Sequence, residues 1–371
     1  MVVPPVALAR PESPGIRGAR KKPSFTRHTQ AFASSAWDRV LRLPSWLILA
    51  ALSFATLLRV GFGAMPNIHN QYKLLVDPFS NPLPSGDSYI WWNWLSPFLG
   101  HLLGLRSGGA YLIFCAVIAL AILPASYLAF RVLGVCAVEA RWRMLLLTSL
   151  PASFTALLWL GMDALTLLLL VLVVAARGRI ILGLTLGVLC GLQHAEQSFL
   201  AIGLLAVASW VSDRRGVRNA AAALVGVVIG KVVLMVIAAY AGGQPIQNRW
   251  DYFVVHHAVF FHQFLGHAPL IAWSVFGAGW LVLWCAGLAR RQLVVVAVVF
   301  VCALLLAATA EDQTRVAAIT TLPAMLVLLS TEAFSVARLR SKLLVPLALV
   351  LPCIWLWKGH NQVSWPYAFL G

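Results

Sequence analysis

Three charged side chains, Glu311, Asp312 and Arg315, stand close together between two long apolar runs, 292–310 and 316–334. Each run approaches the roughly 20 residues that a transmembrane helix needs. A carboxylate can take the proton of a reacting hydroxyl group, and a planar guanidinium can bind a phosphate through two parallel hydrogen bonds. A turn between two spans needs only polar residues, not two acids and an arginine. We therefore expect Glu311, Asp312 and Arg315 to contact a substrate.

Other polar residues interrupt apolar stretches. Asp163 begins an apolar run, His194 and Glu196 lie at the junction of two short ones, and Lys231 lies in the middle of another. Helix capping explains Asp163 equally well, but an ionisable group inside a span needs a partner or a water-filled cavity. We expect these four residues to bind substrate, whereas Arg59, at the end of a run, can extend its charge to the membrane surface.

Asp77 and Asp87 lie in a segment rich in proline and tryptophan, between Gly63 and Gly108. Asp87 follows a glycine in "GDSYIWWNW", where it can cap a helix or act as a general base at the membrane surface. Asp77 precedes a proline and can be a turn residue or a second catalytic carboxylate. Tryptophan favours the membrane–water interface, so we expect the aromatic piece to lie along the bilayer surface.

The composition indicates an all-α, polytopic membrane protein. Of 371 residues, 61% are hydrophobic and 11% charged, and the mean hydropathy is +0.85. Such values are typical of chains that pass repeatedly through a bilayer. The apolar runs predict about eleven transmembrane helices, near 44–62, 109–130, 143–160, 163–176, 180–195, 197–211, 219–241, 269–289, 292–310, 316–334 and 342–357.

The distribution of basic residues predicts the orientation. If the N-terminus and every second loop are cytoplasmic, 21 of the 28 lysines and arginines fall on that side. Cytoplasmic loops are enriched in these residues, so this topology is favoured. The same topology places most histidines and acids in external loops or at the non-cytoplasmic ends of helices, together with Arg59 and Arg315, whereas Lys231 lies in the middle of a run.

Two regions follow from this pattern. Residues 1–43 form a basic segment that we expect to be a disordered cytoplasmic tail touching anionic lipid, not nucleic acid, because aromatic residues and binding motifs are lacking. Residues 44–371 form the membrane domain, with external loops near 63–108 and 242–268.

Glycines repeat every fourth residue at 183, 187 and 191 and at 226 and 230, a spacing that predicts closely packed helices.

The histidines of the second external loop give no metal signature. His256, His257, His262 and His267 are separated by one, five and five positions, unlike the i, i+4 pair of a helical zinc site. Hydrogen bonds to a lipid phosphate or a sugar, or a plain amphipathic surface, explain them better. No metal ligands are therefore predicted.

A resemblance adds a family. The inward N-terminus, the acidic first external loop with "GDSYIWWNW", and the hairpin "LGMDALTLLLLVLVVAARGRIILGLTLGVLCGL" together resemble the GT-C glycosyltransferases, particularly bacterial mannosyltransferase-like members. The resemblance covers about residues 44–240 in layout. The paired acids expected in the first loop are absent, since Asp77 and Asp87 stand ten apart.

The resemblance implies a GT-C-like fold and an inverting sugar transfer on the non-cytoplasmic face of the plasma membrane. The donor would be a polyprenyl-phosphate sugar and the acceptor a glycan, lipid or protein. Asp87 would be the general base, and Arg315, followed by His194 and Lys231, would stabilise the departing phosphate. The missing acid pair leaves a divalent cation, Mg²⁺ or Mn²⁺, as an open question.

Three alternatives stay open on the sequence. A carrier or flippase of lipid-linked sugars would need polar residues along a path to the cytoplasm, whereas here they gather at one face. A membrane acyltransferase would suit the histidines but lacks a matching His/Asp motif. A non-catalytic assembly subunit could use the same fold.

Overall fold

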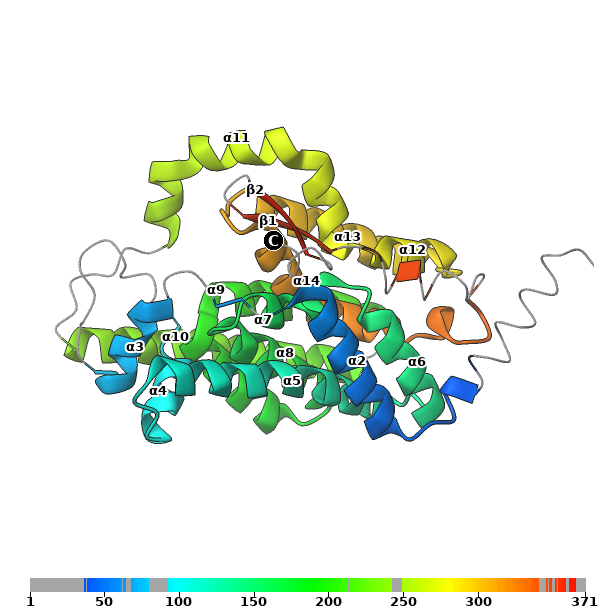
Figure 1. The fold of residues 1–371 in the computed structure, drawn as a ribbon, viewed down its shortest axis with the longest axis horizontal. Helices are drawn as coiled ribbons and strands as arrows, with labels where there is room; N and C mark the ends of the chain where they lie inside the picture. Colours follow the sequence, from blue (N-terminus) through cyan, green and yellow to red (C-terminus); the bar gives the residue numbers. More distant parts are fainter. Residues whose placement is uncertain are drawn as a thin grey trace, which may run out of the picture.

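The fold is predominantly α-helical. The computed structural model describes residues 37, 39–61, 63–64, 68–79, 93–212, 214–241, 249–339, 345, 347–348, 351, 353–357 and 360–364. Its helices are α2 (Ser45–Val60), α3 (Ile68–Val76), α4 (Leu95–Leu102), α5 (Gly108–Val132), α6 (Ala137–Leu147), α7 (Thr155–Leu158), α8 (Asp163–Ala175), α9 (Ile180–Ser212), α10 (Arg214–Tyr240), α11 (Arg249–Phe276), α12 (Gly279–Cys285), α13 (Arg290–Ala307) and α14 (Gln313–Leu329). Two short 3₁₀ turns, η2 (Pro151–Ser153) and η3 (Glu332–Phe334), and one antiparallel hairpin, β1 (Cys353–Trp357) and β2 (His360–Ser364), complete it (Figure 1).

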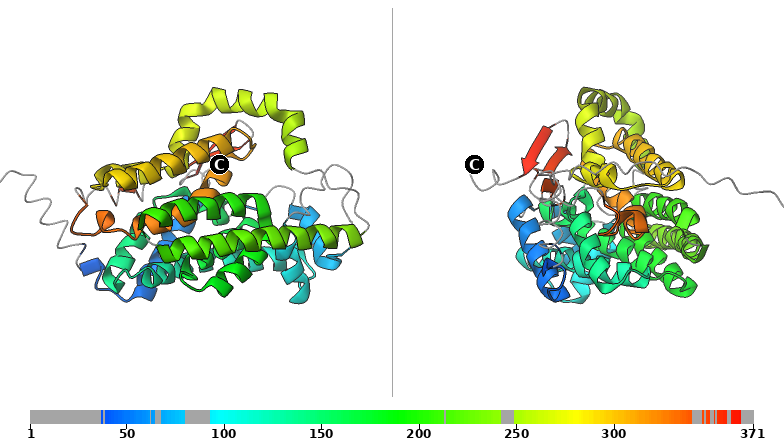
Figure 2. Two further views of the ribbon diagram at one scale, coloured as in Figure 1. Left: turned by 180° about the vertical axis from the view of Figure 1, so that it is seen from behind. Right: turned by 90° about the vertical axis from the view of Figure 1, so that its right-hand side faces the viewer.

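Several described helices have the length and composition of membrane spans. Four qualify, at Gly108–Val132, Arg215–Tyr240, Phe253–Phe276 and Arg290–Ala307, and α2, α8 and α14 are shorter apolar helices. Most of these run side by side in one elongated bundle (Figures 1 and 2). The chain therefore has the architecture of a helical membrane protein.

Three predicted spans are wrong as continuous helices. The run 143–160 is interrupted at Pro151, which opens the turn η2 between α6 and α7. The run 269–289 breaks at Gly277, whose φ of +53° leaves the helical region and separates α11 from α12. The run 342–357 ends in strand β1, where the β-branched and aromatic residues of "CIWLW" suit extended backbone.

The region 180–212 is two helices, as predicted. His194 has non-helical dihedrals, φ −162° and ψ 78°, within α9. Gly183 abuts Asn219 of α10, and Asn219 lines a hollow together with Ser209. A straight helix would hold Gly183 and Ser209 about 39 Å apart, so α9 reverses at His194 and its second half runs back beside the first.

The glycine repeats form the predicted seam between the first half of α9 and α10. A Cβ on Gly187 would overlap the carbonyl oxygen of Ala223, and one on Gly230 would overlap that of Val188. The contacting residue numbers increase in the same direction along both helices, so these two helices run parallel. Only glycine allows backbones to approach so closely.

Replacing Gly187 by alanine is expected to destabilise this seam. The added methyl group has no room against Ala223, and overpacking typically costs about 1–3 kcal/mol. Gly203→Ala is the matched control, because nothing lies within 4 Å of a Cβ there and alanine favours a helix by up to about 1 kcal/mol. Thermal unfolding in detergent should show a lower Tm for Gly187→Ala alone; equal Tm values would contradict the seam.

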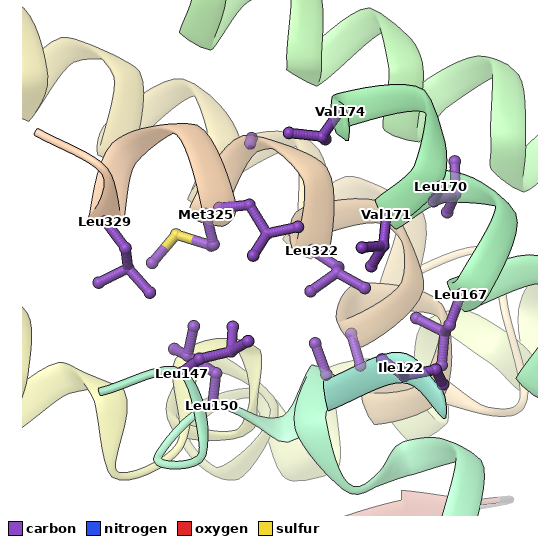
Figure 3. Packing of buried hydrophobic residues seen from close by; sticks show 14 of the residues in the cluster. Ile122, Leu147, Leu150, Leu167, Leu170, Val171, Val174, Leu322, Met325 and Leu329 are labelled. Atoms are coloured by element: carbon purple, nitrogen blue, oxygen red, sulfur yellow. The ribbon is translucent and has the colours of Figure 1, made fainter. Parts of the chain in front are cut away.

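Helix α14 occupies the centre of the bundle, with every residue from Gln313 to Leu329 buried. Its apolar side chains pack against α8, α5 and the segment after α6, as Figure 3 shows for Leu322, Met325 and Leu329. This apolar middle separates two polar ends of the bundle, which the predicted topology assigns to opposite membrane faces.

At the predicted cytoplasmic end, Ser45 at the start of α2 and Tyr127 near the end of α5 share a hydrogen bond of 2.9 Å. Arg143 donates to the carbonyl oxygens of Leu329 and Thr331 at the end of α14. Three tryptophans in the predicted cytoplasmic halves of their helices are at least 70% exposed, as expected of an aromatic belt at a membrane interface: Trp46, Trp210 and Trp284.

Helix α11 arches over one side of the bundle (Figure 1). The described part of the predicted external loop 242–268 begins at Arg249 and is helical, and the same helix continues through Pro269. Val255 and Leu265 are strongly exposed on this arch. The described part of 242–268 is thus an apolar helix and not a loop, and its residues from Phe253 onward belong to a candidate membrane span that ends at Phe276.

Candidate functional site

The predicted residues Asp163, Asp312 and Arg315 form one ionic cluster. Arg315 lies 3.1 Å from Asp163 through Nη1 and 3.1 Å from Asp312 through Nη2. The Asp163 side chain is fully buried, and those of Arg315 and Asp312 are 8% and 16% exposed. Two acids and one base this far from water are costly unless they are paired, so their presence needs a structural or functional reason.

Two helices begin at this cluster. Asp163 is the first residue of α8, and Asp312 is the residue before α14. Negative charge is stabilised at helix N-termini, where backbone N–H groups point outward. The convergence of two N-termini therefore adds favourable electrostatics to the pairing with Arg315, and the capping explanation considered for Asp163 applies in this electrostatic sense.

The charge of the cluster bears on which ligand it suits. Arg315 has a carboxylate on each terminal nitrogen, and its guanidinium carbon lies 6.0 Å from the ring centroid of Trp159. Asp163, Asp312 and Arg315 together carry a net charge of −1. A phosphate would be repelled by both carboxylates, whereas sugar hydroxyls could donate to them. This argues against Arg315 as the main phosphate contact.

Gln193, the residue before His194, connects three elements. Its Oε1 accepts a hydrogen bond from the backbone N–H of Ser96 in α4, and its Nε2 donates to the carbonyl of Met162, each at 2.8 Å. Met162 directly precedes Asp163. A fully buried amide with both ends bonded thus fixes the surface helix α4 relative to the ionic cluster.

Thr314 links the C-terminal hairpin to the same place. Its hydroxyl donates to Ser274 Oγ of α11 at 3.0 Å and accepts from the backbone N–H of Leu356 at 3.1 Å. The hairpin is therefore held beside Arg315. Sequence analysis missed this contact because threonine is ordinary in an apolar helix and a short strand carries little signal.

A second ion pair joins two further predicted residues. Lys231 Nζ of α10 lies 2.8 Å from Glu196 Oε1 of α9. His194, two positions before Glu196, is buried at the point where α9 reverses. Lys231, whose ammonium group lies within an apolar run and was expected to need a partner, therefore has one in Glu196.

Three predicted candidates remain: Asp77, Glu311 and Asp87. Asp77 is exposed and its Oδ1 accepts from the backbone N–H of Phe79 at 3.1 Å, which is the predicted turn role. Glu311 is half-buried beside Asp312. Asp87 lies outside the described residues.

Arg59 has a structural role. It donates to the carbonyl oxygens of Thr148 and Leu351, and its guanidinium lies over the ring of Phe154. It is buried inside the protein, so the expectation that it extends to the membrane surface is wrong.

Within the described part of the chain, no group of three or more histidine, cysteine, aspartate or glutamate side chains could hold a metal ion. No family model, curated protein or solved structure matches the sequence or the fold.

Proposed function

We propose that this protein is an integral-membrane glycosyltransferase that moves a sugar from a polyprenyl-phosphate donor to a glycan, lipid or protein acceptor. The reaction would take place on the non-cytoplasmic face of the plasma membrane. One observation carries the proposal: Asp163 meets Asp312 and Arg315, about 150 positions further along the chain, in a buried cluster at one end of a membrane bundle.

The chemistry requires a base and a stabilised leaving group. The acceptor oxygen attacks the anomeric carbon of the sugar, the bond from that carbon to the phosphate oxygen breaks, and the polyprenyl phosphate leaves with the bonding electrons. A carboxylate takes the acceptor proton. We assign that step to Asp87, with Asp77 as the other loop carboxylate, and assign binding of sugar hydroxyls to Asp163 and Asp312.

The arrangement favours chemistry at one face over transport. A carrier needs polar groups along a path through the bundle, but α14, at the centre, is apolar over most of its length from Val316 to Leu329. Its other polar residues, Thr320 and Thr321, bond to carbonyl groups of their own helix. An apolar middle with the candidate substrate-binding residues at one of the two polar ends suits a reaction whose substrates approach from that side.

A transfer assay in proteoliposomes separates the two functions. We expect radiolabelled sugar to move from polyprenyl-phosphomannose, or another polyprenyl-phosphate sugar in a small panel, to an acceptor. Asp87→Asn should lower the rate by about 10²-fold or more, the usual contribution of a general base. Movement of intact labelled donor across the bilayer without transfer would instead identify a flippase and refute the proposal.

A further inference from the structure

The ion pair between Lys231 and Glu196 faces a different environment from the buried cluster. Its side chains are 24% and 36% exposed, compared with 8% and 0% for Arg315 and Asp163. On α10 the neighbours Val227 and Leu234 are buried. The pair therefore lies where the packed side of α10 meets its exposed side.

The exposed side of α10 is strongly apolar. Val228, Val232 and Met235, which surround Lys231 on the helix surface, are each more than half exposed, and α10 runs along the face seen from behind in Figure 2. Such a surface on a membrane-spanning helix contacts lipid. Two charged groups at its edge open toward the bilayer and not toward bulk water.

The pair lies below the headgroup region of the outer leaflet but close enough for a lipid headgroup to approach it. Lys231 follows Arg218, at the predicted cytoplasmic boundary, by thirteen residues, or about 20 Å of helix. Because the hydrocarbon core is about 30 Å thick, Lys231 lies roughly 10 Å below the opposite surface. A lysine side chain covers much of that distance.

The surface helices border the same position. Leu234 and Ala238 of α10 pack with Leu74 of α3 and Trp94 at the start of α4. The Lys231–Glu196 pair thus lies one turn below the place where the first external segment rests on the bundle. A ligand that reaches the pair from the bilayer would lie beneath this segment.

We propose that Lys231 and Glu196 form a lateral binding site for the polar head of a membrane lipid. Lys231 binds the lipid phosphate, and Glu196 accepts a hydrogen bond from an ammonium or hydroxyl group on the same headgroup. The pair is electrically neutral, so it complements a headgroup that carries both a phosphate and a hydrogen-bond donor. A lipid-linked sugar phosphate has these two groups, and in that respect the site would extend the proposed function.

Native mass spectrometry of the purified protein tests the site without any transfer reaction. The probes are phosphatidylethanolamine, which has a phosphate and a donor, phosphatidylcholine, which lacks the donor, and diacylglycerol, which lacks both. We expect about tenfold greater retention of phosphatidylethanolamine than of phosphatidylcholine, the effect of one charge-assisted hydrogen bond. Diacylglycerol should be retained least.

Variants assign the two halves of the site. Lys231→Met should lower phosphatidylethanolamine retention about tenfold, and Glu196→Gln should remove the preference over phosphatidylcholine. The double variant Lys231→Met/Glu196→Gln avoids an unpaired carboxylate and should lose retention as well. Lys73→Met, at an exposed position of α3, is the control and should behave as the parent protein.

Three results would overturn the inference. Unchanged retention in both Lys231 variants would exclude the lysine, and equal retention of diacylglycerol would show that only the acyl chains bind. Displacement of the lipid by inorganic phosphate alone would show that the site takes free phosphate. Because lipid retention is measured without donor or acceptor, a failure here leaves the glycosyltransferase proposal standing, and the converse also holds.

Discussion

Replacing Arg315 by methionine is expected to destabilise the protein by about 3–5 kcal/mol, because it leaves a buried carboxylate without its counter-charge. Asp163 has no exposed side-chain surface, so water cannot take the place of the guanidinium. The double variant Arg315→Met/Asp163→Asn removes the fully buried charge, leaves only the partly exposed Asp312 without Arg315, and should regain much of the loss. The free energy of unfolding in detergent, measured for both single variants and the double variant, gives the coupling energy.

The ion pair at the other end of the bundle provides the control. Arg143 pairs with Glu139 at 3.2 Å, but it also donates to the carbonyls of Leu329 and Thr331. Arg143→Met should therefore destabilise the protein without being rescued by Glu139→Gln. If the second substitution restored stability in both double variants, or in neither, the proposed difference between Arg315 and Arg143 would be contradicted.

Replacing Gln193 by leucine is expected to cost about 2–5 kcal/mol. The change leaves the N–H of Ser96 and the carbonyl of Met162 buried without this partner, and each such loss typically costs about 1–3 kcal/mol. Because Gln193 ties α4 to the residue before Asp163, hydrogen exchange at the start of α4 should also accelerate.

Gln197→Leu is the matched control on the same helix. The Gln197 side chain is also buried, but neither polar atom has a hydrogen-bond partner within the described protein. Its removal should cost less than about 1 kcal/mol, since no protein hydrogen bond is lost. Equal destabilisation by the two leucine substitutions would show that amide burial, and not the link between helices, sets the effect.

The sequence predicted the helical class and, for some basic residues, which of them lie at the same end of the bundle. Basic residues of separate loops assigned Arg143 and Arg177 to one end, where contacts and a shared hollow now place them with the end of α14. The glycine repeats predicted the α9–α10 seam because close approach leaves a regular four-residue spacing. These features follow from composition and periodicity, which a single sequence displays.

Other features depend on contacts that have no local signature. Asp163 and Arg315 were each expected to function, but their pairing joins residues 152 positions apart. The break at Gly277 and the strand β1 at Cys353–Trp357 lie in runs as apolar as a true span, so hydropathy could not separate them from helices. In the sequence, Gln193 is one polar residue among several near a helix junction, and no local pattern indicates its two hydrogen-bond partners.

The most direct test of the central claim compares sugar transfer in variants of the two bundle ends. Asp163→Asn keeps the shape of the side chain at the proposed site, and Glu139→Gln does the same at the opposite end. Reconstituted at equal amounts with a polyprenyl-phosphate sugar and its acceptor, Asp163→Asn should lose at least about 10²-fold in kcat/KM, and Glu139→Gln should match the parent protein. Full transfer by folded Asp163→Asn protein would show that the cluster is structural and that the reaction takes place elsewhere.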